Sequence, residues 1–144
     1  MVYIGCDHGG VELKNEIIAC VEAMGETVKD LGTYTADSVD YPDYGFAVGE
    51  AVAKDVGSRG IVICKTGVGM SICANKVKGV RCALCTSVDM GRLCREHNNA
   101  NVLALGASNT SRETALDIVK TFLTTEFAGG RHAGRVGKIT SYEG

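Results

Sequence analysis

The sequence predicts a three-layer α/β/α domain built on a five-stranded parallel sheet. Short apolar runs alternate with longer amphipathic patterns along the whole chain, an order that implies crossover connections and parallel strands. The runs are almost continuously apolar, as strands are when helices cover both faces of a sheet. The chain has 144 residues and shows no linker, repeat or low-complexity tract, so residues 1–144 are expected to form a single domain.

The first half of the chain is expected to contain three strands and two helices. An apolar run predicts a strand over residues 1–5. The helix predicted over 11–25 has apolar residues three and four apart and ends on a glycine, a usual stop signal. A short strand is expected over 27–32. A proline then precedes a helix over 43–57, and the apolar run of 59–64 predicts the third strand.

The second half repeats the alternation. A short helix is expected over 69–77 and a strand over 80–85. The helix of 87–97 begins at a serine suited to cap it, and a fifth strand is expected over 101–106. A long amphipathic helix over 111–127 follows. This order is typical of a Rossmann-like domain, in which binding sites gather at the carboxyl ends of the strands.

The composition excludes several classes of protein. The net charge is −2, from 15 basic and 17 acidic residues, so nothing draws the chain to nucleic acid or to a membrane surface. Its apolar runs are far too short to span a bilayer. The N-terminus shows no basic stretch followed by an apolar run, so no signal peptide is expected and a cytoplasmic location is predicted.

The seven cysteines are expected to be free thiols in a reducing compartment, because their number is odd. Cys82 and Cys85 form a C-x-x-C motif, but within a predicted strand. Residues three apart in a strand point to opposite faces, so we expect no zinc or other metal there. The number of thiols also leaves open a redox-sensing protein.

The segment "CKTGVG" follows the third predicted strand. Gly67 and Gly69 allow a tight turn, and the helix start after them offers free N–H groups to an anion. Cys64 stands just before this turn, where a thiol is more readily ionised and suits a general base. The alternatives are that Cys64 is a buried strand residue and that Thr66 only caps the helix. Ile72 replaces the third glycine of a dinucleotide fingerprint, so no nucleotide site is expected.

All three histidines lie at the ends of predicted elements. Asp7 and His8 follow the first strand, where a carboxylate could orient an imidazole or simply cap the next helix. His97 ends a helix, where the helix dipole favours a cation, and a structural C-cap is the alternative. His132 lies in the final basic segment.

That final segment, residues 129–143, is expected to be helical. Arg131, Arg135 and Lys138 are spaced four and three apart and would share one face. Three cations on one face suggest a bound anion such as phosphate. The alternative is a solvated basic face.

Taken together, these segments resemble those of the type B ribose-5-phosphate isomerases, whose family also includes the allose-6-phosphate and galactose-6-phosphate isomerases. The matching segments are "GCDHGG", "VDYPDY", "GIVICKTGVGMSICANK", "REHNNANVLALG" and "GGRHAGRV", in order along nearly the whole chain. The resemblance implies a metal-independent aldose–ketose isomerase that needs no cofactor. Its substrates would be ribose 5-phosphate and ribulose 5-phosphate.

The resemblance also implies the catalytic roles. Cys64 would be the base that moves a proton between C1 and C2 of the open-chain sugar. Thr66 and the N–H groups of Gly67, Val68 and Gly69 would hold the enediolate oxygen. His97 would be the acid that opens the sugar ring.

The substrate-binding residues follow in the same way from the resemblance. Asp7 and Asn98 would bind sugar hydroxyls, and Tyr41 would line the pocket. The residues expected to bind the phosphate are His8, Arg131 and Arg135. His132 matches a family position whose role stays open.

This sequence departs from its relatives at two positions. Lys65 replaces the usual glycine after the cysteine, and its side chain could either point to solvent or add positive charge near the site. Ser108 stands where relatives usually carry an arginine that helps to hold the phosphate. We therefore expect weaker phosphate discrimination and some tolerance of unphosphorylated or longer sugars.

The resemblance further implies a homodimer, or a dimer of dimers, in which His97 and Asn98 face Cys64 of the other chain. Three functional alternatives stay open at this point. The substrate could be a six-carbon sugar phosphate such as allose 6-phosphate or galactose 6-phosphate, or a free aldose. The chain could also be a non-catalytic module that binds a sugar phosphate.

Overall fold

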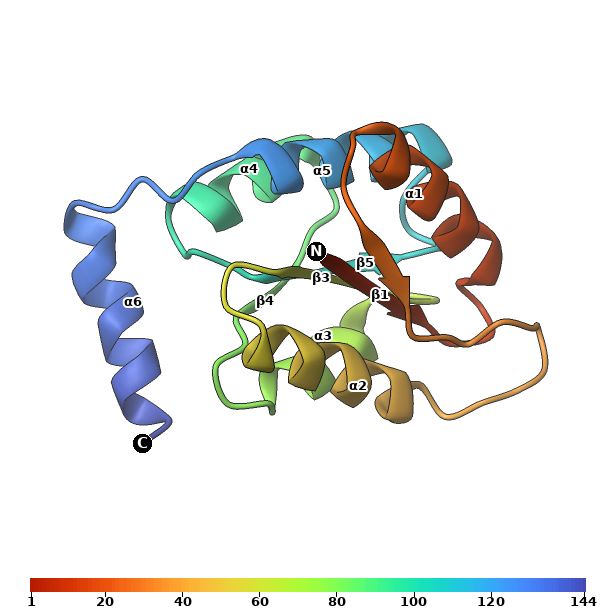
Figure 1. Cartoon of the computed structure of the whole chain (residues 1–144), viewed down its shortest axis with the longest axis horizontal. Coiled ribbons are helices and arrows are strands. Elements are labelled where there is room, and N and C mark those ends of the chain that lie inside the picture. The colour runs from red at the N-terminus through yellow and green to blue at the C-terminus, as the bar shows by residue number, and fades with distance from the viewer.

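The sheet is the centre of the molecule. A computed structural model describes residues 1–144 and shows one five-stranded sheet in the order β2-β1-β3-β5-β4 (Figure 1). Every neighbouring pair is parallel, which confirms the predicted fold class. The strands are β1 (Val2–Cys6), β2 (Val28–Asp30), β3 (Arg59–Cys64), β4 (Cys82–Leu84) and β5 (Val102–Gly106).

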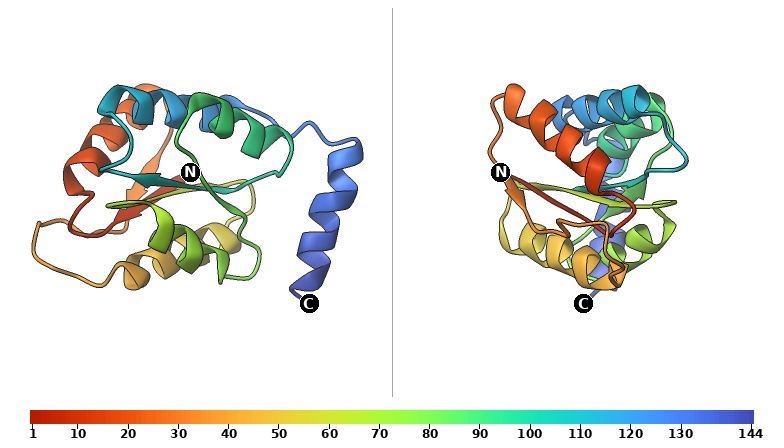
Figure 2. Two further views of the ribbon diagram at one scale, coloured as in Figure 1. Left: turned by 180° about the vertical axis from the view of Figure 1, so that it is seen from behind. Right: turned by 90° about the vertical axis from the view of Figure 1, so that its right-hand side faces the viewer.

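Helices cover both faces of the sheet. Figures 1 and 2 show α1, α4 and α5 on one face and α2 and α3 on the other. The sixth helix, α6, stands apart beyond one end of the sheet. None of the helices is both long and apolar enough to cross a bilayer. The helices are α1 (Val11–Ala23), α2 (Tyr41–Lys54), α3 (Val68–Asn75), α4 (Val88–Glu96), α5 (Arg112–Thr124) and α6 (Arg131–Tyr142).

Several predicted element ends differ from the structure by a few residues. The two edge strands, β2 and β4, are only three residues long, because a strand at the edge of the sheet has one neighbour to pair with. Helix α2 begins at Tyr41, before the predicted start, with Pro42 in its first turn, where its missing N–H costs nothing. The predicted cap of α4 is confirmed: the Ser87 hydroxyl accepts a hydrogen bond from the Met90 amide at 3.2 Å.

The core has two parts, one on each face of the sheet. A cluster of 17 buried residues lies under α1, α4 and α5, and one of 9 lies under α2 and α3. Alternate residues of β3 feed the two parts, Ile61 and Ile63 on one side and Val62 and Cys64 on the other. Cys85 belongs to the first cluster and Cys82 packs against the second, so the two cysteines of the C-x-x-C motif face opposite ways, as predicted.

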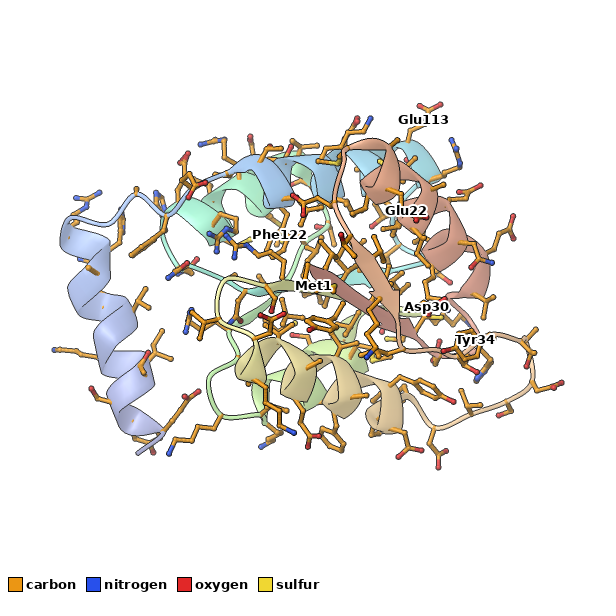
Figure 3. The ribbon with its side chains drawn as sticks, in the orientation of Figure 1. Met1, Glu22, Asp30, Tyr34, Glu113 and Phe122 are labelled. Carbon is orange, nitrogen blue, oxygen red and sulfur yellow. The ribbon has the colours of Figure 1, made fainter.

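A buried lysine ties the loop after β2 to α1. Lys14 has no exposed surface, and its ammonium donates to Asp30 Oδ1 at 2.6 Å and to the Thr33 carbonyl at 2.7 Å. The same Nζ lies 4.7 Å from the centre of the Tyr34 ring. Figure 3 shows Asp30 and Tyr34 near each other, beside β2 and the loop that follows it. A buried ammonium requires such partners, so Lys14 fixes the loop that leads to Tyr41 and α2.

Candidate active site

A pocket of about 390 Å³ opens at the carboxyl end of β3. It is the place where an open α/β sheet is expected to carry a site. Seven of the predicted site residues line this pocket, together with Ile72 of α3, which we did not predict to take part. The seven are Asp7, Tyr41, Cys64, Lys65, Thr66, Val68 and Gly69.

The Cys64 sulfur faces the start of α3. Cys64 is the last residue of β3 and is 6% exposed, and its Sγ accepts a hydrogen bond from the Gly67 amide at 3.1 Å. Gly67 has φ +80°, the left-handed region, and a Cβ built there would lie 2.5 Å from Leu84 Cδ1. The glycine is therefore required by both backbone and space, and it is what turns an amide back onto the sulfur.

Thr66 and Gly69 shape the rest of the turn. The Thr66 hydroxyl accepts from the Val68 amide at 3.3 Å, so Thr66 does stabilise the helix start, although the capping position itself is occupied by Gly67. A Cβ on Gly69 would lie 2.5 Å from the Tyr41 ring. The tyrosine of α2 thus packs directly on the helix backbone, where only glycine leaves room.

The residues after β1 complete this half of the site. Asp7 is 8% exposed, and its Oδ1 accepts from the Gly9 amide at 2.9 Å. It holds the turn and does not cap α1, whose N-cap is Gly10. His8 Nδ1 accepts from the Val39 amide at 3.2 Å. That contact assigns the proton of a neutral His8 ring to Nε2.

A second group of predicted residues gathers where α4 ends and α6 begins. His97 is the C-cap of α4, and its ring stacks on that of His132, with centroids 4.3 Å apart and planes 18° apart. Loss of solvent around the ring lowers the pKa of His132, and the positive charges of His97, Arg131 and Arg135 lower it further. The stack joins α4 to α6, whose Arg131 and Arg135 lie close enough to His132 to affect its pKa.

The two groups lie at opposite ends of the sheet within one chain. Gly60, at the start of β3, donates to the Asn101 carbonyl at 2.9 Å, so the turn after His97 and Asn98 lies at the amino ends of the strands. Cys64 is four residues further along β3 and pairs with Gly106. At about 3.3 Å per residue, the strand alone separates the groups by about 13 Å. Figure 1 shows α6 beyond one end of the sheet and the loop after β2 at the other.

The comparisons with known proteins agree with this architecture. A model of the family described as Ribose/Galactose Isomerase matches residues 2–139. The chain belongs to the Ribose/Galactose Isomerase family.

Members of that family are similar to this chain over its whole length. Ribose-5-phosphate isomerase B of Escherichia coli is 44% identical over 142 residues, which cover 99% of this chain and 95% of that protein. The structure of Clostridium thermocellum ribose-5-phosphate isomerase B is 55% identical, with a TM-score of 0.96, over 99% of this chain and 96% of that one. The Mycoplasma genitalium isomerase B with bound ribulose-5-phosphate is 42% identical, also with a TM-score of 0.96, over 99% of this chain and 95% of that one.

The cysteines differ in how their surroundings affect ionisation. All seven cysteines are free. Burial raises the pKa of Cys6 to about 11 and that of Cys82 to about 12. Burial also raises the pKa of Cys73, and a charge on Cys64 would raise it further. In each case the environment disfavours the thiolate form.

Sequence reasoning missed two features of this family member. Nothing in the sequence indicated that His132 would stack on His97, because the contact joins two helices 35 residues apart in number. Lys14 was detectable: it falls between Leu13 and Ile17 on the apolar stripe of α1. A lysine in that position predicts a buried partner.

Proposed function

We propose that this chain interconverts ribose 5-phosphate and ribulose 5-phosphate. The observation that carries the proposal is the similarity to an isomerase B holding ribulose-5-phosphate, joined to the pocket around Cys64. Residues 1–144 would act as a single sugar-phosphate isomerase domain. Such an isomerisation moves one hydrogen from C2 to C1 and one proton from O2 to O1, so that the carbonyl moves from C1 of the aldose to C2 of the ketose.

Cys64 is the base of the proposed reaction. As a thiolate it would take the proton from C2 and return it to C1. The Gly67 amide supports this role because a thiolate accepts a hydrogen bond more strongly than a thiol does. Cys64 is almost fully buried and lines the pocket, so a sugar seated there would keep the transferred proton from exchanging freely with water.

The start of α3 would stabilise the enediolate formed between the two proton transfers. The Gly67 amide is directed at the sulfur and the Val68 amide at Thr66. The next amides, of Gly69 and Met70, lie in the first turn of α3, where no helical carbonyl can accept from them. Fixed N–H donors aimed at a developing oxyanion are among the strongest aids to such a reaction, and losing one costs about 3 kcal/mol.

Each active site would be built from two chains. One chain contributes the group around Cys64, with Asp7, His8 and Tyr41. The partner contributes the second group, in which His97 opens the sugar ring, Asn98 binds a hydroxyl, and Arg131 and Arg135 bind the phosphate. A twofold axis that brings one end of the sheet to the other end of a second copy makes two such sites at once.

Exposed apolar side chains support that assembly. Val68 and Ile72 of α3 are 50% and 56% exposed, and both line the Cys64 pocket. Ile139 of α6 is 49% exposed. A patch of this kind at the rim of a site fits a protein interface better than solvent.

A substrate panel on purified protein tests the function. Ribose 5-phosphate, allose 6-phosphate, galactose 6-phosphate and free ribose would be assayed with the wild type, Cys64→Ala and Cys73→Ala, the last as a control that removes the neighbouring buried thiol. We expect turnover of ribose 5-phosphate to fall about 10²- to 10⁴-fold in Cys64→Ala, with binding kept, and to persist in Cys73→Ala.

Each other result has a definite meaning. Preferred turnover of a six-carbon phosphate or a free aldose would replace the proposed substrate but keep the chemistry. Binding without turnover by the wild type would make the protein a sugar-phosphate binding module. Equal turnover by Cys64→Ala and the wild type would remove Cys64 from the reaction.

A further inference from the structure

A second hollow lies at the amino ends of the strands, away from the Cys64 pocket. Its volume is about 300 Å³, and its lining is mainly polar, with Arg59 and Arg81 as its two cations. Asn99, Asn101 and Ser58 also line it. None of these five residues belongs to the proposed catalytic machinery. The volume is at the lower end of the range for small-molecule sites.

The hydrogen bonding of Arg59 is incomplete. Its Nε is buried and has no partner, and its Nη1 reaches only the Gly57 and Ser58 carbonyls at 3.4 Å. A buried N–H left unpaired is costly, and native structures rarely keep one without a reason. Because the Nη1 contacts are long, an acceptor oxygen entering the hollow would find this end of the guanidinium only weakly engaged. The Nε itself has almost no exposed surface, so it would be reached only if the side chain turned.

The lining of this hollow holds two arginines and one aspartate, so positive charge exceeds negative charge there by one. Burial lowers the pKa of Arg81 and of Arg95, which the charges of Arg59 and Arg81 lower further. The charges of Arg59 and Arg81 thus reach Arg95, which is not part of the lining. The one carboxylate in the lining, Asp55, already accepts from the Tyr3 hydroxyl at 2.8 Å, and Glu143, which faces Arg81, accepts from the Gly79 amide at 2.9 Å.

We propose that this hollow is a binding site for a small phosphate-bearing anion. Two guanidinium groups offer the planar paired donors that bind a tetrahedral oxyanion well. The hollow also borders the turn that presents His97 and Asn98, since Arg81 Nε donates to the Asn99 carbonyl at 2.9 Å. An anion held there would contact and stiffen that turn.

The test must distinguish binding in this hollow from binding at Arg131 and Arg135, the phosphate-binding residues of the proposed active site. We would titrate inorganic phosphate, and separately glycerol 3-phosphate, into the ¹⁵N-labelled Arg131→Gln/Arg135→Gln protein. Amide signals of Ser58, Gly79 and Asn101 report on the hollow, and those of Gly69 and Met70 report on the Cys64 pocket. Potassium chloride at matched ionic strength controls for general salt effects.

We expect saturable shifts at the hollow, with a Kd that weakens about tenfold or more when Arg59→Gln is added. Arg92→Gln is the matched control, since it removes an exposed arginine of α4 and should leave that Kd unchanged. Tighter binding of glycerol 3-phosphate than of phosphate would identify an ester as the ligand, and the reverse would identify free phosphate.

Two results would overturn the proposal. One is the absence of shifts at the hollow beyond those that chloride causes. The other is the same Kd with and without Arg59→Gln. If Arg59→Gln does not give a folded spectrum, Arg59→Lys keeps the charge but loses the Nε and the paired donors. It is then expected to weaken binding about threefold, and an unchanged Kd in that variant would equally overturn the proposal.

Discussion

At the scale of single residues, the site depends on where hydrogen-bond donors point. The Gly67 amide points at the Cys64 sulfur at 3.1 Å, and the left-handed Gly67 makes that direction possible. The motif "CKTGVG" was sufficient to predict the turn, because glycine spacing reports directly on backbone conformation. It could not predict that Gly69 is also needed to make room for the Tyr41 ring, since that contact depends on how α2 packs.

Ser108 offers a test of phosphate binding at one position. Its amide donates to the Lys65 carbonyl at 2.9 Å, and it lines a hollow of about 310 Å³ with Gly9 and Arg112, so it lies beside the Cys64 turn. We expect Ser108→Arg to lower the KM for ribose 5-phosphate about tenfold or more, because a charge-assisted hydrogen bond contributes about 1.5–3 kcal/mol. Steady-state kinetics measure the change.

Ser108→Ala is the control for that substitution, since it alters the same position without adding charge. Its KM should stay within about twofold of the wild type. If Ser108→Arg leaves the KM unchanged, position 108 takes no part in phosphate binding in this protein.

At the scale of elements, we expect the connection between α4 and α6 to respond to pH. It depends on the stacked rings of His97 and His132, and Val136 is the one residue of α6 that is buried. The pKa of His132 is lowered by loss of solvent and then by neighbouring positive charges. The native state therefore disfavours the proton on His132, and the unfolded state binds more protons.

The stability of the native state is therefore expected to fall as the pH falls. The packing of neutral His132 contributes fully above its ordinary pKa of 6.5, and the contribution is lost as the pH falls through the lower native value. We expect the wild type to lose more free energy of unfolding than His132→Phe between about pH 7.5 and about pH 5. Urea unfolding at the two pH values measures it, and equal losses in both proteins would contradict the expectation.

The elements and their ends show which features of the fold could be predicted from the sequence. The alternation of strands and helices was predictable because period and length are local properties, and the Ser87 cap was predictable for the same reason. The short lengths of β2 and β4 could not be predicted, because the length of an edge strand depends on how far its one neighbouring strand pairs with it. The family resemblance already implied that His97 and Asn98 lie apart from Cys64 of the same chain. The residues alone could not show this, because it follows from the topology, which puts the turn before β5 at the opposite end from Cys64.

At the scale of the whole molecule, that separation makes one chain an incomplete enzyme in the proposed mechanism. Mixing two inactive variants tests this. Cys64→Ala and His97→Asn, refolded together in equal amounts, would form mixed dimers with one intact site out of two. Since half of the dimers are mixed, we expect activity to return to about a quarter of the wild-type value.

The control is a mixture of Cys64→Ala with Asp7→Asn. Both changes affect the same half of the site, so no mixed dimer contains an intact one, and activity should stay at the level of the separate variants. If the first mixture recovers no more activity than this control, each chain builds its own site and the shared arrangement is wrong.

The position of α6 has a consequence for how the sequence evolves. This helix projects beyond the end of the sheet (Figure 1). Contacts at its two ends tie it to its own chain, namely the stack of His132 on His97 and the hydrogen bond from the Gly79 amide to Glu143, and Val136 is its one buried residue. If Arg131 and Arg135 of α6 bind substrate in the partner's Cys64 pocket, a substitution near Arg135 can be tolerated only when residues that line that pocket change with it. Alignments of relatives should then show paired substitutions between α6 and the loops after β1 and β3, although no atom of one touches the other within a chain.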